Sequence, residues 1–134
     1  MGRYAEAADA LKKAVRQQED FGRAWSDLGA VYVELGRHSE AVAALEKATR
    51  LRPDLPEAWC NLGCAYGELK RYDAAIAACR TAVRLKPDYV AAWYNLATVY
   101  KEAGRKDKMA EASRKVRELD PDAGKELARK LAAP

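Results

Sequence analysis

The segment Trp25-Ser26-Asp27-Leu28-Gly29 decides the fold, because its pattern returns twice at a fixed distance. It returns as Trp59-Cys60-Asn61-Leu62-Gly63 and as Trp93-Tyr94-Asn95-Leu96-Ala97. Each tryptophan is followed seven residues later by a tyrosine, at Tyr32, Tyr66 and Tyr100. Pro-Asp pairs keep the same spacing of 34 residues, at Pro53-Asp54, Pro87-Asp88 and Pro121-Asp122. A period of this length indicates a repeat protein, in which similar units stack along one axis.

Each repeat is expected to contain two helices. From Trp25 to Tyr32 the apolar residues stand at i, i+3 and i+7, which is one face of a helix. Gly36 and Gly104 end first helices in a left-handed turn, a conformation that strains Lys70 at the equivalent place. Proline then ends each second helix. The expected helices are 22–35, 38–51, 56–69, 72–85, 90–103 and 106–119.

The composition is that of one globular domain. The chain has 134 residues, 49% of them hydrophobic and 33% charged, with a net charge of +4. No window approaches the ~18 uninterrupted apolar residues of a membrane-spanning helix, and the first residues have no apolar stretch typical of a secretory signal. We therefore expect no membrane insertion and a cytoplasmic location, which three cysteines without a disulfide framework also favour.

These positions resemble the tetratricopeptide repeat (TPR) family, which has a period of 34 residues. The first full repeat carries Trp25, Leu28, Gly29, Tyr32, Ala41, Leu45, Ala48 and Pro53. The second carries Trp59, Leu62, Gly63, Tyr66, Ala75, Cys79, Ala82 and Pro87. The third keeps Trp93, Leu96, Ala97, Tyr100 and Pro121, and departs from the pattern at Met109, Ser113 and Val116. Those departures bear on the packing of its second helix.

The resemblance implies an all-α, right-handed superhelical solenoid. The expected organisation is a half-repeat holding only a second helix (1–21), three repeats (22–55, 56–89 and 90–121) and a C-terminal capping helix (122–134). Two interpretations of the half-repeat stay open. The chain is either cut from a longer array, or this helix acts alone as the N-terminal cap.

In TPR proteins the first helices line a concave groove, so the resemblance implies a set of peptide-binding candidates. They are Arg23, Ser26, Asp27, Cys60, Asn61, Cys64, Tyr94, Asn95, Thr98 and Lys101. Asp27, Asn61 and Asn95 stand at the same position of each repeat. An amide can both donate to and accept from a peptide backbone, and the arrangement is similar to the asparagine ladder of TPR domains of the O-GlcNAc transferase type. The alternative is that these side chains are simply solvated.

Other chemistry-bearing residues have structural interpretations. Cys60 and Cys64 share a helix face but lack further metal ligands nearby, so we interpret them, like Cys79, as small buried hydrophobes. His38 is expected to cover a helix start. The basic stretch that runs from Arg105 to Arg117 is interpreted as a solvated helix face; contact with nucleic acid or an acidic protein is the weaker alternative.

The functional expectation is a protein–protein interaction module that binds an extended peptide or a partner's helix. We expect no catalysis, cofactor or metal, because the sequence has a single histidine and neither a nucleophile–base pair nor a phosphate loop. Two alternatives stay open. One is a homo-oligomer that stacks through the N-terminal face of Ala7, Leu11, Ala14 and Val15. The other is a regulatory segment of a larger enzyme such as a glycosyltransferase.

Overall fold

The computed structural model describes residues 2–17 and 21–134, and residues 14–17 by their backbone alone. These residues form eight α-helices and no strand. The helices are α1 (Gly2–Gln17), α2 (Gly22–Glu34), α3 (His38–Leu51), α4 (Pro56–Glu68), α5 (Tyr72–Leu85), α6 (Val90–Glu102), α7 (Lys106–Leu119) and α8 (Pro121–Ala132). The bounds of α3, α5 and α7 are those predicted, and α2, α4 and α6 each end one residue before the predicted position.

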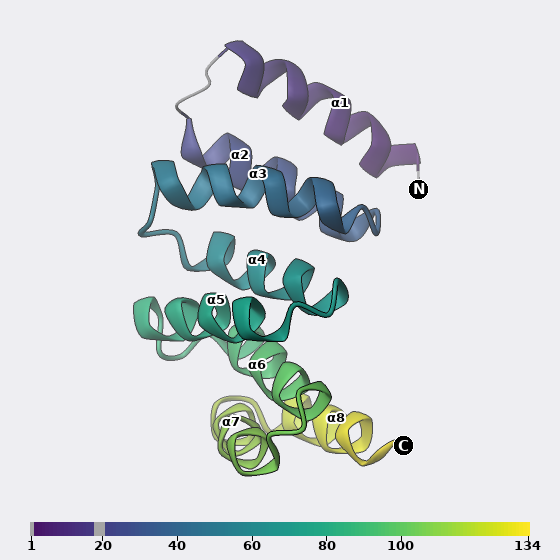
Figure 1. The fold of residues 1–134 in the computed structure, drawn as a ribbon, viewed down its shortest axis with the longest axis vertical. Helices are drawn as coiled ribbons and strands as arrows, with labels where there is room; N and C mark the ends of the chain where they lie inside the picture. The colour runs from purple at the N-terminus through teal and green to yellow at the C-terminus, as the bar shows by residue number, and fades with distance from the viewer. Residues whose placement is uncertain (1, 18–20) are drawn as a thin grey trace.

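The helices form pairs that stack along one axis (Figure 1). The most extensive contacts join α2 to α3, α4 to α5 and α6 to α7. Between pairs, α2, α4, α6 and α8 contact one another in order and form one continuous layer, which we call the first-helix layer. In the described part of the chain, α3 does not contact α5 and α5 does not contact α7, so the second helices are spaced apart on the other side of the stack.

The stack turns along its length. In Figure 1, α3 lies across the view whereas α7 is seen end-on. The molecule is therefore the all-α superhelical solenoid that the repeat period predicts.

A left-handed residue ends the first helix of each repeat, as predicted. Gly36 and Gly104 have φ of 73° and 76°, and Lys70 is forced to a φ of 61° at the same place. The chain then turns back, and the Arg71 amide donates to the Tyr66 carbonyl at 2.9 Å. The equivalent hydrogen bonds form in the other two repeats. These turns fix the angle between the two helices of each pair.

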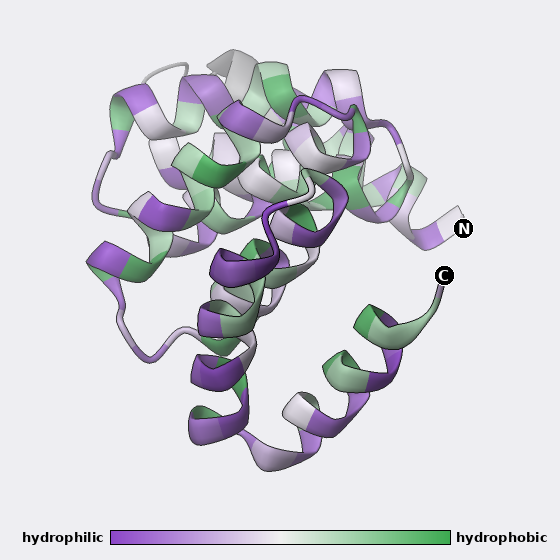
Figure 2. Cartoon of the chain, turned by 60° about the horizontal axis from the view of Figure 1, so that its bottom comes forward, coloured by the Kyte–Doolittle hydropathy of each residue, from purple (hydrophilic) through white to green (hydrophobic). Residues whose placement is uncertain are grey.

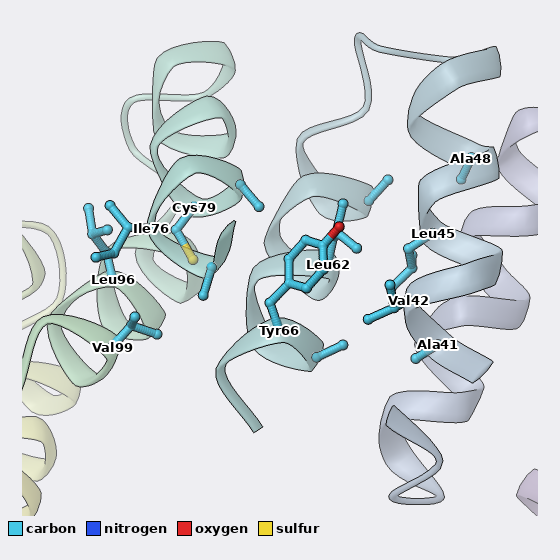
Figure 3. Close-up of a cluster of buried hydrophobic side chains, with 14 of the residues drawn as sticks. Ala41, Val42, Leu45, Ala48, Leu62, Tyr66, Ile76, Cys79, Leu96 and Val99 are labelled. Carbon is cyan, nitrogen blue, oxygen red and sulfur yellow. The ribbon is translucent and has the colours of Figure 1, made fainter. Parts of the chain in front are cut away.

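Small residues let the two helices of a pair approach closely. A methyl group added at Gly29 would overlap the side chain of Leu45, and one added at Gly63 would overlap the sulfur of Cys79. Leu45 and Cys79 are both fully buried, as Figure 3 shows for the core cluster that they belong to. The interpretation of Cys79 as a core residue is thus confirmed.

The repeating aromatics serve two structural purposes. The tyrosines that follow each tryptophan by seven residues are buried, and the tryptophans are half-buried against the same core. The indole N–H of Trp59 donates to the Pro53 carbonyl at 2.9 Å, and that of Trp93 donates to the Pro87 carbonyl at 2.8 Å. These bonds tie each first helix to the turn that precedes it.

The departures of the third repeat do not unpair its second helix. Val116 is fully buried, and Met109 and Ser113 are half-buried. Helix α7 therefore packs against α6 as α5 packs against α4.

The C-terminal helix begins at Pro121, one residue before the predicted 122. Its N-cap residue, Asp120, differs in type from the equivalent residues before α4 and α6. The carboxylate of Asp120 accepts from the Ala123 amide at 3.1 Å, so a helix can begin at once. The equivalent residues, Arg52 and Lys86, have no acceptor, and α4 and α6 begin three residues later in register. Leu127 of α8 is fully buried, so the helix closes the core.

The N-terminal end exposes two aromatic side chains. Tyr4 is 45% exposed and Phe21 is 53% exposed. Of the predicted stacking face, Leu11 instead packs against the molecule's own core and Ala7 is half-buried, whereas the side chains of Ala14 and Val15 lie outside the described residues. Within residues 2–17 and 21–134, no helix combines the length and apolarity that crossing a bilayer would need.

Candidate functional site

The predicted polar row lies on the first-helix layer. Asp27 of α2 is exposed, and Asn61 of α4 and Asn95 of α6 are half-buried. Because α2, α4 and α6 contact one another in order, the three side chains follow one another across the layer. Among the described residues, Asn61 makes no hydrogen bond to another side chain or to the backbone, so its amide is available to a ligand.

Two contacts join neighbouring first helices, and both involve residues that are predicted to bind a peptide. Arg23 of α2 pairs with Glu57 of α4 at 3.2 Å. The side-chain amide of Asn95 of α6 donates to the sulfur of Cys60 of α4 at 3.4 Å, a weak bond that leaves the side-chain oxygen of Asn95 unused. These contacts hold the layer together and orient Asn95.

Two residues of the predicted binding set are buried. Ser26 and Cys60 are each only 3% exposed, and Cys60 clusters with Ala82 of α5 and Ala92 of α6. A peptide lying on the surface therefore cannot reach either side chain. The interpretation of Cys60 as a small buried hydrophobe is confirmed.

Helix α8 engages the predicted residues of the third repeat. The Lys101 ammonium lies 3.4 Å from the Lys130 carbonyl and 2.5 Å from the Ala133 carbonyl, at the C-terminal end of α8. The Lys130 ammonium stands 5.4 Å from the centre of the Tyr94 ring. The hydroxyl of Thr98 donates to the Asn95 carbonyl within α6. Tyr94 and Lys101 thus already have partners in the chain, which their sequence positions alone did not indicate.

The thiols of the layer have low reactivity. Burial raises the pKa of Cys60 to about 11. Burial, together with the nearby carboxylates of Glu68 and Glu34, also raises the pKa of Cys64, which is half-buried. A neutral thiol is a poor nucleophile and a poor metal ligand, and the described residues contain no group of three or more His, Cys, Asp or Glu that could hold a metal ion.

The exposed groove positions of α2, α4 and α6 are acidic, whereas α8 adds the exposed bases Lys125, Arg129 and Lys130. Asp27, Glu34, Glu68 and Glu102 are exposed, and in the described part of the chain none of them belongs to an ion pair. Of the basic residues at groove positions, Arg23 is paired with Glu57 and Lys101 is bound to α8. The layer therefore presents free carboxylates around a row of polar side chains.

The structure also has hollows on the opposite side, which sequence reasoning did not find. One of about 510 Å³ lies over α6 between α5 and α7, and one of about 400 Å³ lies over α2 between α1 and α3. They exist because the second helices do not contact one another. The basic stretch in α7 indicates one wall of the first hollow. The other wall, with Arg80 and Arg84, lies on α5, about one repeat earlier in the sequence.

Comparison with known proteins identifies the repeats. Models of the TPR repeat and the tetratricopeptide repeat match residues 29–70, 56–89 and 78–111, which together span 29–111. A comparison with curated protein sequences gave no match.

Solved structures of similar proteins have the same fold. A crystal structure of MamA has 31% identity and a TM-score of 0.85, with 90% of this chain and 70% of that chain covered. MamA from Desulfovibrio magneticus RS-1 has 25% identity and a TM-score of 0.82, with 90% and 68% covered. YrrB, described as a TPR protein with an unusual peptide-binding site, has 26% identity and a TM-score of 0.84, with 96% and 67% covered.

The period of 34 residues, the paired helices and these similarities agree with one another. TPR folds are typically non-catalytic and bind protein partners. The chain belongs to the tetratricopeptide repeat family of protein-interaction modules.

Proposed function

We propose that the first-helix layer binds an extended peptide or partner helix across α2, α4 and α6. The observation that carries this proposal is the row of Asp27, Asn61 and Asn95, one polar side chain per helix on one side of the layer. Helices packed ~8–10 Å apart offer one such group for roughly every third residue of an extended strand, which advances ~3.3–3.6 Å per residue. An amide side chain can then pair with both the N–H and the C=O of that strand.

The charge of the layer favours a peptide with basic side chains. The exposed carboxylates of Asp27, Glu34, Glu68 and Glu102 are not neutralised by ion pairs within the described residues. Complementary charge speeds the encounter of two partners and disfavours acidic competitors. The likeness to YrrB, whose description includes a peptide-binding site, supports peptide binding by this chain.

The test is enrichment from a library of extended peptides on the immobilised full chain, comparing wild type with Asn61→Ala and with Asn61→Ala/Asn95→Ala. We expect the wild type to enrich peptides rich in lysine and arginine, and the double variant to lose most of that enrichment. Thr81→Ala is the matched control, because its hydroxyl bonds only to the Ala77 carbonyl on α5, outside the layer. Equal enrichment by wild type and the double variant would contradict the proposal.

A second candidate function is self-association through the N-terminal end. The observation that favours it is the exposure of Tyr4 and Phe21, two large apolar side chains. A light-scattering mass that rises with concentration, and that falls in Tyr4→Glu/Phe21→Glu, is the expected result. A monomeric mass at high concentration would exclude this function.

A further inference from the structure

The hollow over α6 is a groove with an apolar floor and basic walls, which we call the outer groove. Its floor is made by Trp93, Leu96 and Tyr100 of α6, and its volume is about 510 Å³. Helix α5 forms one wall and α7 forms the other, and hydrophilic residues are frequent along α7 (Figure 2). The outer groove uses the side of α6 that faces α5 and α7, and Asn95 does not line it, so it can bind independently of the proposed peptide site.

Positive charge dominates the walls. The basic residues are Arg80, Arg84, Lys108, Arg114 and Lys115, and the acidic ones are Glu111 and Glu118. Lys108 and Glu111 lie 3.7 Å apart as an ion pair, and Lys115 stands 5.9 Å from the centre of the Trp93 ring.

The three arginines of the walls differ from these partly engaged side chains. In the described part of the chain, no ion pair or hydrogen bond engages the guanidinium groups of Arg80, Arg84 or Arg114. Free guanidinium groups around an apolar floor select for carboxylates rather than for another apolar surface.

The contact between the first two repeats contains an internal example of what fits this place. The Tyr66 hydroxyl of α4 donates to the carboxylate of Glu46 of α3 at 2.6 Å. One period later these positions hold Tyr100 and Arg80. Arg80 cannot accept a hydrogen bond, and among the described residues the Tyr100 hydroxyl has no partner. The contact between the second and third repeats thus keeps the donor, Tyr100, and has the cation Arg80 in place of the acceptor.

We propose that the outer groove binds an acidic segment of a partner protein. One carboxylate of that segment takes the place that Glu46 has between the first two repeats. In the outer groove this carboxylate accepts from Tyr100 and pairs with Arg80. Arg84 and Arg114 bind its neighbouring carboxylates, and an apolar side chain between them packs on Leu96. Nucleic acid fits less well, because Glu111 and Glu118 interrupt the basic walls and Lys115 covers the Trp93 ring, which is therefore not free for base stacking.

The test is fluorescence polarisation of the full chain with a fluorescein-labelled heptapeptide of glutamates around a central leucine. Arg80→Glu supplies the missing acceptor from within and is expected to weaken binding by about tenfold or more. Tyr100→Phe removes only the hydroxyl and is expected to weaken binding by about fivefold. Because this change is small, it keeps the test valid if Arg80→Glu disturbs the fold.

Three matched variants define the site. Tyr66→Phe removes a hydroxyl that Glu46 already occupies, Arg129→Glu makes the same charge change on α8, and Asn61→Ala/Asn95→Ala alters the first-helix layer. All three should leave the affinity within about twofold of wild type. The proposal is overturned if Arg129→Glu weakens binding as much as Arg80→Glu, if the peptide does not bind at low salt, or if a single-stranded oligonucleotide of equal charge competes more strongly than the peptide.

Discussion

At the scale of single residues, the turn between the two helices of the second repeat holds a residue that its backbone does not favour. Lys70 has the left-handed backbone that Gly36 and Gly104 adopt without a side chain. For a residue with a Cβ this conformation costs about 1–2 kcal/mol. The repeat tolerates it because the hydrogen bond from the Arg71 amide to the Tyr66 carbonyl closes the turn regardless of the side chain.

Lys70→Gly should therefore stabilise the protein. We expect the free energy of unfolding to rise by about 1 kcal/mol, because the strain at Lys70 is removed and part of the gain is offset by the entropy of a glycine in the unfolded chain. The reverse change, Gly104→Lys, should lower it by a similar amount. Urea unfolding followed by circular dichroism measures both, and a Lys70→Gly variant less stable than wild type would contradict this explanation.

The three thiols should differ in reactivity. Cys60 and Cys79 are buried and their pKa values are raised by burial, to about 11 for Cys60, whereas Cys64 is half-buried. A thiol reagent at pH 8 should modify Cys64 first, and Cys60 and Cys79 only in denaturant. The rate at Cys64 should rise as the pH rises toward its raised pKa, because the thiolate fraction grows.

The control for that assignment is Cys64→Ser. This variant should show no fast phase in the folded state and two thiols after unfolding. A fast phase that persists in Cys64→Ser would mean that the helices open more readily than the buried positions of Cys60 and Cys79 imply.

At the scale of helix pairs, the two residues that face each other where the helices approach most closely vary together in size. The first two repeats oppose Gly29 to Leu45 and Gly63 to Cys79, with no room for a methyl group at either glycine. The third repeat has Ala97 and Ser113 at these positions. A larger residue on α6 thus accompanies a smaller one on α7, which explains why the departure at Ser113 does not unpair the helix.

Gly63→Ala should destabilise the protein by about 1–3 kcal/mol, because the added methyl group overlaps the Cys79 sulfur. Adding Cys79→Ser, which reproduces the third-repeat pair, should recover a large part of the loss. Gly67→Ala is the control. The added methyl group would lie 3.3 Å from the nearest atom, on the Val99 side chain. Because alanine favours a helix more than glycine does, stability should be unchanged or raised. A double variant no more stable than Gly63→Ala in urea unfolding would refute the coupling.

The sequence predicts the helices well because their signals are local. The period of 34 residues, the turn glycines and the prolines all act within one pair, and the observed bounds of α2–α7 agree to within one residue. It fails where the outcome depends on a neighbouring pair. Ser26 and Cys60 have groove positions in the repeat register but are buried, Cys60 against Ala82 of α5 and Ala92 of α6. Likewise, nothing in α6 alone indicates that α8 engages Tyr94 and Lys101.

At the scale of the whole molecule, the two sides of the stack differ in charge. The first-helix layer exposes unpaired carboxylates, and the outer groove exposes unpaired arginines. The sequence predicts the first side from the repeat register. It does not predict the second, because Arg80 and Arg114 lie on opposite walls of a groove between helices that do not contact each other. Together, the two proposed sites would let the molecule hold two partners of opposite charge at once.

The central claim is that the first-helix layer is the peptide-binding surface. The most direct measurement is a titration of the ¹⁵N-labelled chain with a peptide enriched from the library, observing the side-chain amide signals of Asn61 and Asn95. We expect both signals to shift in proportion to occupancy, together with backbone signals of α2, α4 and α6, while those of α3 and α5 change little. Unchanged Asn61 and Asn95 signals with shifts confined to α3, α5 and α7 would contradict it.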